Sequence, residues 1–349
     1  MKDWDNKAIE RLHEMILNAG RITVIGHTHP DGDAIGSCIG MASYIESLGK
    51  DVATAFPDSI EYSLAFLFED RKGQKNFILS ENKEGLINRL ASSDLIICQD
   101  FNSFKRTEAM EAYLSESKAL KVLIDHHLNP EIASFDLVFS KTDISSTCEL
   151  LFYILMEMPE IGNDAGRLPK ECSKALMAGM TTDTNNFANS VFPSTFKMAA
   201  SLIAAGVDRD SILSNLYNEY RENRLRAMGY MLNKNMKILP EGLAYMIMTK
   251  QIEEEYGLKD GETEGFVNLP LSLSKVKMSV LLKEDKNYFR VSVRSKQGVS
   301  ANKMASLYFN GGGHERAAGG KLYFPENIER KEEAESYILK VAEEFFKQV

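Results

Sequence analysis

Cysteine, tryptophan and long apolar stretches are scarce in this chain of 349 residues, which contains four cysteines and one tryptophan. The cysteines form no Cys-x-x-Cys pair, and each sits among apolar neighbours (Cys38, Cys98, Cys148 and Cys172). We therefore expect reduced thiols in the core, rather than disulfides or thiolate metal ligands. No apolar run approaches the ~18 residues that span a bilayer, and the first residues contain no apolar signal core. We expect a cytoplasmic protein without a membrane partner.

Positive charge is also in short supply. Lysine and arginine number 41 against 50 aspartates and glutamates, a formal net charge of -9. Long nucleic acids bind to broad basic surfaces that neutralise many phosphates, so the acidic balance disfavours a track for long RNA or DNA and a processive nuclease. It does not exclude small anionic substrates, because bound divalent ions can reverse the local field.

The first part of the chain alternates between strand and helix patterns. Strands are predicted at 22–26, 51–56, 94–99, 120–124 and 135–139, and helices at 7–17, 34–48, 106–115 and 149–156. This alternation indicates a mostly parallel sheet with helices on both faces. The hydroxyls of Ser145-Ser146-Thr147 are expected to cap the helix that follows. The alternative is that the N-terminus of this helix points at a functional site.

The second part begins with helical periodicity from 194 to 237, which ends at the turn Pro240-Glu241-Gly242. A strand at 243–248, a hairpin of 276–282 with 289–293, and helices at 301–308 and 328–346 follow in the predicted order. We expect an α/β catalytic domain (1–193), a helical linker (194–237) and a smaller α/β substrate-binding domain (238–349).

The segment His27-Thr28-His29-Pro30-Asp31-Gly32-Asp33 directly follows an apolar strand. Open α/β sheets place their chemistry at the carboxyl ends of strands, and oxygen and imidazole ligands suit Mn, Mg or Zn. The segment is therefore a candidate metal site. The alternative is a turn rich in aspartate with an exposed histidine.

Three further segments repeat this arrangement. Asp100 follows the strand Leu95-Ile96-Ile97-Cys98, Asp125-His126-His127 follows Val122-Leu123-Ile124, and Asp183 follows a helix-like stretch. Chance can scatter acids along a chain, but their repeated position after apolar elements favours one shared site.

A glycine triplet, Gly311-Gly312-Gly313-His314, is the main candidate in the second part. Glycines let backbone amides approach an anion closely, although such triplets are also common in turns. Arg294 ends a hairpin strand, where its guanidinium can clamp a terminal phosphate or remain solvated. Ser300 and Asn302 are weaker candidates for the same pocket.

Together these five motifs resemble the DHH phosphoesterase superfamily with its associated C-terminal domain, over about Ile22 to Gly320. The resemblance implies two divalent metal ions, with manganese favoured and Mg, Co or Zn as alternatives. It implies that His27 and Asp31 hold the first ion, that Asp33, His126 and Asp183 hold the second, and that Asp100 bridges both. Asp125 is expected to orient a ligating imidazole, and His127 to contact the scissile phosphate or the leaving oxygen. The family usually has a glycine soon after its fourth acid, where this chain has Asn185 and Asn186.

The function that this resemblance implies is hydrolysis of very short RNA from one end, combined with removal of the 3'-phosphate of adenosine 3',5'-bisphosphate (pAp). The glycine motif would then bind a phosphate of the substrate. A phosphodiesterase for pApA or cyclic dinucleotides is the alternative among enzymes, and the glycine motif with Arg294 disfavours an inorganic pyrophosphatase. From another class, a degenerate nucleotide-binding regulator is the alternative. The expected partners are short RNA or small phosphorylated nucleotides, and a homodimer stays open.

Overall fold

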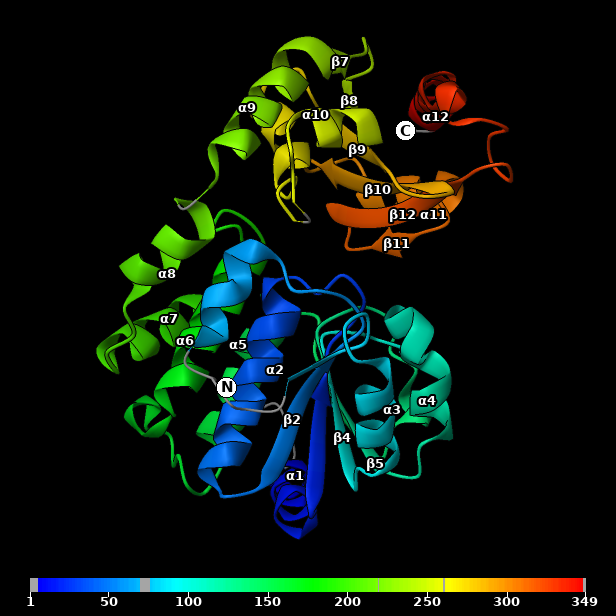
Figure 1. Cartoon of the computed structure of the whole chain (residues 1–349). Coiled ribbons are helices and arrows are strands. Elements are labelled where there is room, and N and C mark those ends of the chain that lie inside the picture. The colour runs from blue at the N-terminus through cyan, green and yellow to red at the C-terminus, as the bar shows by residue number, and fades with distance from the viewer. Residues whose placement is uncertain (1–5, 70–75, 219, 260, 348–349) are drawn as a thin grey trace. The chain divides into compact units, whose positions relative to one another are not determined.

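The computed structural model describes residues 6–69, 76–218, 220–259 and 261–347. The chain divides into two compact units, residues 1–219 and 220–349 (Figure 1). The boundary falls inside the stretch expected to be a linker, so that α7 (Pro193–Ala204) and α8 (Arg209–Tyr217) belong to the first unit and α9 (Glu222–Tyr230) to the second. The assignment of separate catalytic and substrate-binding roles to the units stays a prediction.

The first unit contains a six-stranded sheet in the order β3-β2-β1-β4-β5-β6, and every pair of neighbours is parallel. Its strands are β1 (Arg21–Ile25), β2 (Asp51–Phe56), β3 (Asn76–Ile78), β4 (Leu95–Gln99), β5 (Leu120–Asp125) and β6 (Leu137–Ser140). Strands β1, β2, β4 and β5 are buried along most of their length, because helices cover both faces of a parallel sheet. The strand order reverses between β1 and β4. This is the place where open α/β sheets bind ligands.

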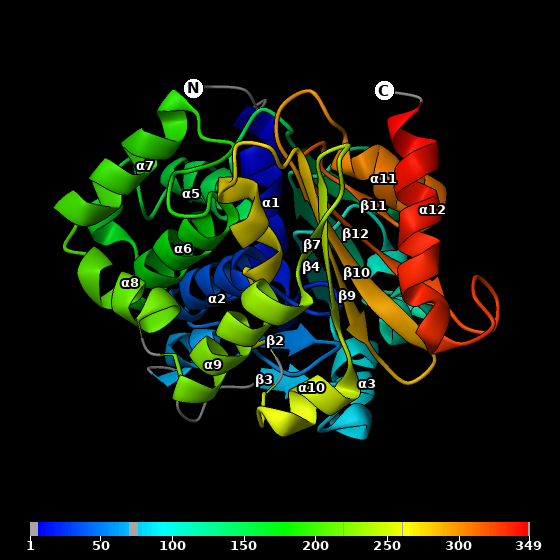
Figure 2. The ribbon, with the colours of Figure 1, turned by 90° about the horizontal axis from the view of Figure 1, so that it is seen from above.

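Two layers of helices enclose this sheet and confirm the expected fold class (Figure 1). One layer comprises α1 (Asn6–Asn18), α2 (Gly32–Ser47), α5 (Thr147–Met156) and α6 (Lys170–Asp183), and the other comprises α3 (Lys83–Ala91) and α4 (Glu111–Glu116). Helices α2, α5 and α6 lie side by side (Figure 2). A Cβ atom at Gly36 would come within 2.5 Å of the Ala175 carbonyl oxygen. Glycine there lets α2 and α6 approach closely.

The expected helix at 106–115 is only partly correct. Residues Phe104–Met110 form the 3-10 helix η3, and α4 begins at Glu111. Glu108 interrupts the helix because its backbone has a φ of 45° and a ψ of -102°. The other short helices among the described residues of this unit are η1 (Tyr62–Leu67), η4 (Ile132–Ser134) and η5 (Ala165–Arg167).

The second unit contains a mixed sheet in the order β11-β12-β10-β9-β8-β7, in which only β8 and β9 are parallel. Its strands are β7 (Lys237–Ile238), β8 (Leu243–Met248), β9 (Met278–Glu284), β10 (Tyr288–Ser295), β11 (Gly312–Gly313) and β12 (Ala317–Tyr323). The predicted hairpin is confirmed as β9 and β10. Two of the three glycines expected in a loop form the short strand β11.

Helices α11 (Ala301–Tyr308) and α12 (Ala334–Phe346) cover one face of this sheet (Figure 2). The expected closing helix from 328 starts too early, because Asn327 accepts hydrogen bonds from Asn310 and the Tyr323 amide and holds the preceding segment as a turn. The remaining elements are α10 (Lys250–Glu255), the π-helical turn η6 (Met231–Asn235), η7 (Phe266–Ser272) and η8 (Lys331–Glu333). No helix in the described parts of the chain is long and apolar enough to cross a membrane.

Candidate metal and phosphoester site

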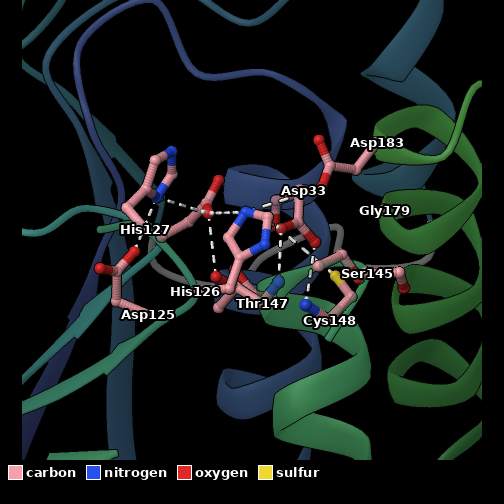
Figure 3. A network of polar contacts seen from close by, with 12 residues as sticks. Asp33, Asp125, His126, His127, Ser145, Thr147, Cys148, Gly179 and Asp183 are labelled. Carbon is pink, nitrogen blue, oxygen red and sulfur yellow. Dashed lines mark hydrogen bonds and ion pairs between the residues drawn. The ribbon is translucent and has the colours of Figure 1, made fainter. Parts of the chain in front are cut away.

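The four acid-bearing and imidazole-bearing segments of the first unit converge at the carboxyl edge of its sheet (Figure 3). Asp100 lies at the centre, with its two carboxylate oxygens each 3.5 Å from the Nε2 atom of a histidine, His27 on one side and His126 on the other. The His126 Nε2 atom also lies 3.6 Å from Asp183 and 3.9 Å from Asp33. The structure therefore brings together the side chains that the sequence proposed as metal ligands.

Asp100 belongs to three groups of described residues whose potential ligand atoms lie within 4.8 Å of one another. The first is His27, Asp31 and Asp100, the second is Asp33, Asp100 and His126, and the third joins Asp100 to Asp125 and His127. The first two groups parallel the expected sets of ligands on either side of a shared carboxylate. The role of each residue stays a prediction, but the geometry provides two adjacent binding positions that share Asp100.

Two of the acids are held by the N-terminus of α5. The backbone amides of Thr147 and Cys148 donate to the two carboxylate oxygens of Asp33, at 2.6 and 2.9 Å, and the Thr147 hydroxyl donates to Asp100 at 2.9 Å. Ser146 caps the helix by accepting from the Glu149 amide at 3.0 Å. The helix is therefore both capped as expected and directed at the site. The positive end of the helix dipole faces these two carboxylates, which stabilises their negative charge.

Glu149, which was not among the candidate residues predicted from the sequence, accepts hydrogen bonds that hold the segment around this helix end in place. It is fully buried, and its Oε2 atom accepts from the hydroxyls of Ser145 at 2.5 Å and Thr195 at 2.7 Å. The Ser145 amide donates to the same oxygen at 3.1 Å. The Ser-x-x-Glu spacing of Ser146 and Glu149 is the sequence signal of a capping box and could have identified this residue.

Crowding of acids makes the site electrostatically unfavourable without a cation. Burial, followed by the charge of Asp183, raises the pKa of Asp33 to about 7. Burial, followed by the charges of Asp33 and Asp31, raises the pKa of Asp100 well above its usual range. Burial lowers the pKa of both His27 and His126, which favours the neutral imidazole that binds metals. Carboxylates and neutral imidazoles at these distances fit a site for divalent ions.

Asp31 begins α2 as its N-cap, and its Oδ1 atom accepts from the amides of Asp33 and Ala34 at 3.0 and 3.1 Å. His29, which lies between the first two candidate ligands, has a φ of 49°, and its amide donates to Asp58. The cap fixes the direction in which α2 leaves β1. The start of this helix therefore places two of the three expected ligands of the first motif, Asp31 and Asp33.

Asp125 and His127 form a carboxylate–imidazole pair, with Oδ1 and Nδ1 2.7 Å apart. Asp125 therefore orients His127, the residue expected at the scissile phosphate. Asp125 is also the neighbour in sequence of the proposed ligand His126. A buried carboxylate on one ring nitrogen fixes the tautomer and leaves Nε2 for proton transfer.

After Asp183, the last residue of α6, the backbone is left-handed at three successive positions. Asn185, Asn186 and Phe187 have φ angles of 47°, 55° and 66°. Asparagine adopts this conformation more readily than most residues, so Asn185 and Asn186 can replace the expected glycine. Arg209 holds the segment by donating to Asn186 at 2.6 Å and by lying over the ring of Phe187.

The candidates of the second unit lie around β10, β11 and β12. Arg294 donates to the carbonyl oxygens of Val293 and Ala318, at 3.0 and 3.4 Å. A Cβ at Gly313, whose φ is 141°, would come within 2.8 Å of β12, so the fold itself requires glycine there. Ser300 caps α11 and donates to Glu315, and Asn302 donates to the Gly313 carbonyl. His314 begins the connection from β11 to β12, and its amide donates to the Ala317 carbonyl oxygen at 2.8 Å.

Comparisons with known proteins agree with this geometry. The model of the DHH family N-terminal domain matches residues 21–180, and that of the DHHA1 domain matches residues 242–348. The first range contains all the candidate residues of the first unit except Asp183. The second contains Arg294 and the glycine motif.

Three relatives illustrate the range of similar proteins. A bifunctional oligoribonuclease and PAP phosphatase, NrnA, from Bacillus subtilis is 28% identical over 88% of this chain and 92% of its own. The cyclic-di-AMP phosphodiesterase PdeA of Listeria monocytogenes is 24% identical over 90% of this chain but 46% of its own. The crystal structure of an exopolyphosphatase-related protein from Bacteroides fragilis is 31% identical, with a TM-score of 0.89, and covers 100% of this chain and 99% of that one.

The chain therefore belongs to the DHH family of phosphoesterases and carries the associated DHHA1 domain. It is a metal-dependent hydrolase of phosphoester bonds.

Proposed function

We propose that the protein hydrolyses very short RNA from one end and removes the 3'-phosphate of adenosine 3',5'-bisphosphate. The observation that carries this proposal is the central position of the buried Asp100 between two groups of ligand atoms. Such a site suits attack on a phosphoester between two ions. The choice of substrate is supported by NrnA of Bacillus subtilis, which is similar over nearly the whole length of both chains.

In this proposal His27 and Asp31 would hold one ion, Asp33, His126 and Asp183 would hold the other, and Asp100 would be a ligand shared by the two. When bound, two divalent ions, with Mn favoured, polarise the phosphoester and lower the pKa of water. The fixed helix end at Thr147 and Cys148 keeps Asp33 in place before substrate arrives. The site is therefore organised by the protein and is completed by metal.

His127 is proposed to protonate the leaving oxygen. Its Nδ1 atom is held by Asp125, which stabilises the charged imidazolium and leaves Nε2 as the proton donor. The side chain is 20% exposed, whereas Asp125 is fully buried, so the ring can meet substrate while its partner stays dry. An alternative role for His127 is structural support of the site.

The second unit is proposed to bind a terminal phosphate through Arg294 and the glycine motif with His314. A substrate anchored by its end would present only a nearby phosphoester for hydrolysis, which supports the proposed cleavage from one end. Hydrolysis of pApA or cyclic dinucleotides is the second candidate, supported by the likeness to PdeA of Listeria monocytogenes.

The test is an activity panel with Mn²⁺ that compares short RNA, adenosine 3',5'-bisphosphate, pApA, a cyclic dinucleotide and pyrophosphate. We expect the highest kcat/KM for RNA of two to a few nucleotides, together with phosphate release from the bisphosphate. An internally labelled circular RNA should resist cleavage. Fast cleavage of that circle would contradict action from one end, preference for the cyclic dinucleotide would favour the second candidate, and binding without turnover would indicate a regulator.

A further inference from the structure

The segment that follows Asp100 contains an arginine to which the proposed function gives no role. Arg106 lies in the 3-10 helix η3, six residues after Asp100, and it is exposed. Within the described parts of the chain, no hydrogen bond or ion pair joins its guanidinium group to another side chain or carbonyl oxygen. The guanidinium is therefore available to an anion that arrives from solution.

The backbone of Arg106 is fixed beside the first motif. Its carbonyl oxygen accepts a hydrogen bond from the Thr28 amide at 2.9 Å, and Thr28 directly follows His27 in the chain. The start of the same segment is held on its other side, where the Asn102 side chain donates to the Leu128 carbonyl oxygen at 2.7 Å. The segment therefore lies at the carboxyl edge of the sheet, between the turns that follow β1 and β5.

The charge of Arg106 reaches the candidate metal site. Burial is the main cause of the lowered pKa of His27; the charge of Asp31 opposes this shift, and the positive charge of Arg106 adds to it. Interactions between charges more than about 10 Å apart are largely screened, so the guanidinium lies within that range of the His27 ring. His27 itself is buried, but 60% of the Asp31 side chain is exposed. The site is therefore accessible on the side where Arg106 lies.

An anionic substrate needs positive charge that the proposed ligands would not leave over. The four carboxylates among these ligands would balance the charge of two divalent ions (Asp31, Asp33, Asp100 and Asp183). A phosphoester brings at least one further negative charge. A guanidinium suits this charge because its planar N–H groups match two oxygens of a phosphate. Arg106 thus has the charge and the geometry of donors that the site would otherwise lack.

We propose that Arg106 is a substrate-binding residue, which donates hydrogen bonds to the non-bridging oxygens of the phosphoester that is hydrolysed, beside His27 and Asp31. This inference rests on the proposed function. It also predicts a dependence on substrate that differs from that of the proposed anchor at Arg294. Every substrate has a phosphoester to be hydrolysed, whereas only some have a terminal phosphate. Loss of the Arg106 side chain should therefore affect all substrates alike.

The experiment compares wild type with Arg106→Ala and Arg106→Lys in the full-length protein. The matched control is Lys105→Ala, which removes the neighbouring cation of the same helix. The Lys105 side chain is 73% exposed, and its Nζ atom lies 3.8 Å from a carboxylate oxygen of Glu131. These substitutions keep the main-chain hydrogen bond between Arg106 and Thr28, so the loop itself is not removed.

Three readouts are used. The first is kcat/KM with Mn²⁺ for a chromogenic phosphodiester, the adenosine bisphosphate and a diribonucleotide. The second is calorimetric binding of inorganic phosphate to the Mn²⁺-loaded protein, measured in an Arg294→Ala background so that phosphate bound at the proposed anchor does not contribute. The third is the affinity for Mn²⁺ in the absence of substrate, which reports on the ligands alone.

We expect Arg106→Ala to lower kcat/KM by about tenfold to a hundredfold on all three substrates, because one charge-assisted contact is lost. Affinity for inorganic phosphate should fall by about tenfold or more. Arg106→Lys keeps the charge but not the paired donors, so its losses should be smaller. The control should match wild type. Affinity for Mn²⁺ should not fall in any of these variants, because Arg106 is not among the proposed ligands.

Unchanged kcat/KM and phosphate binding in Arg106→Ala would overturn the inference. It would also be overturned by a loss of activity that follows an equal loss of Mn²⁺ affinity, since Arg106 would then support the ligands. A loss confined to substrates with a terminal phosphate would contradict contact with the scissile phosphoester. A wild-type protein that hydrolyses the chromogenic ester but neither nucleotide would contradict the proposed function, while a loss on that ester in Arg106→Ala would still support the inference.

Discussion

The two units of this chain have opposite charge. Residues 1–219 contain 20 lysines and arginines against 32 aspartates and glutamates, whereas residues 220–349 contain 21 against 18. The net charge of -9 is thus the sum of -12 for an acidic unit, which concentrates carboxylates at one sheet edge, and +3 for a slightly basic unit. The net charge of a whole chain can therefore hide a basic unit. An argument against a cationic surface has to use the charge of each unit separately. The acidic unit suits the proposed metal site, and the slightly basic unit suits the proposed phosphate anchor.

The largest expected effect that tests this division is loss of the shared carboxylate in the first unit. Asp100→Asn should reduce kcat by about a thousandfold, because metal ions supply several kcal/mol of transition-state stabilisation. The variant should also bind less Mn²⁺, measured by metal analysis after gel filtration, while circular dichroism stays that of wild type. The control is Asp164→Asn, an acid 60% exposed and outside the site. Full metal content and wild-type turnover in Asp100→Asn would contradict the assignment.

The second prediction concerns the anion-binding unit. Arg294→Ala or His314→Ala should lower kcat/KM by about tenfold to a hundredfold on substrates with a terminal phosphate, because one charge-assisted contact is worth about 1.5–3 kcal/mol. A generic chromogenic phosphodiester should be affected much less. Arg330→Ala, 75% exposed, is the matched control. Equal losses on both substrates would show that these residues support the fold and not the ligand.

The third prediction tests whether the orientation of Asp100 matters for metal binding when its charge is left unchanged. Thr147→Val removes the hydroxyl that donates to Asp100 but keeps the shape of the side chain. Partners that orient metal ligands typically contribute a factor of 10–100 in affinity, so we expect Mn²⁺ affinity to fall about tenfold in calorimetric titration. Thr147→Ser retains the hydroxyl and should bind metal like wild type. Unchanged affinity in Thr147→Val would mean that the backbone amides of α5 suffice.

The smallest expected effect is the pH dependence of stabilisation by metal. Since the pKa of Asp33 is raised to about 7 in the folded protein, that carboxyl keeps a proton at pH values where the unfolded chain has lost it. On this account the free energy of unfolding of the metal-free protein falls as pH rises towards 7. Mn²⁺ must displace the proton, so its binding strengthens as pH rises.

Mn²⁺ at ten times its Kd should stabilise the protein by about 1.4 kcal/mol at pH 8, and by up to about 1 kcal/mol less at pH 6. Hydrogen exchange should show this protection in α2 and α5, while β9 and β10 remain unchanged. Equal protection of both units, or stronger stabilisation at pH 6, would contradict the assignment of the metals to the acidic unit.

The sequence predicted those elements whose pattern is local and strong. The apolar strands β1, β4 and β5, the hairpin of β9 and β10, and α11 all lie within a residue or two of their expected positions. The candidate acids could be found because each follows such an element. Strand β12 was missed because its sequence, Ala317-Ala318-Gly319-Gly320-Lys321-Leu322-Tyr323, looks like a loop and becomes a strand through pairing with β10.

The contacts that hold the acids of the site in place could not be predicted from the sequence, for a different reason from that given for β12. Thr147 and Cys148 contact an acid more than 110 residues earlier in the chain, and Glu149 contacts Thr195, 46 residues later. Such contacts depend on how helices pack and leave no periodic pattern. The sequence did contain a capping signal at Ser146 and Glu149, but it does not show which carboxylate the helix end faces.

Asp100 has a backbone φ of 64°, in the left-handed region that glycine, asparagine and aspartate tolerate best. Glutamate has the same charge but not this local preference, and its longer side chain would move the carboxylate away from both histidines. Glycine and asparagine suit the backbone but lack the negative charge. Backbone conformation and charge therefore favour the same amino acid at this position for two independent reasons.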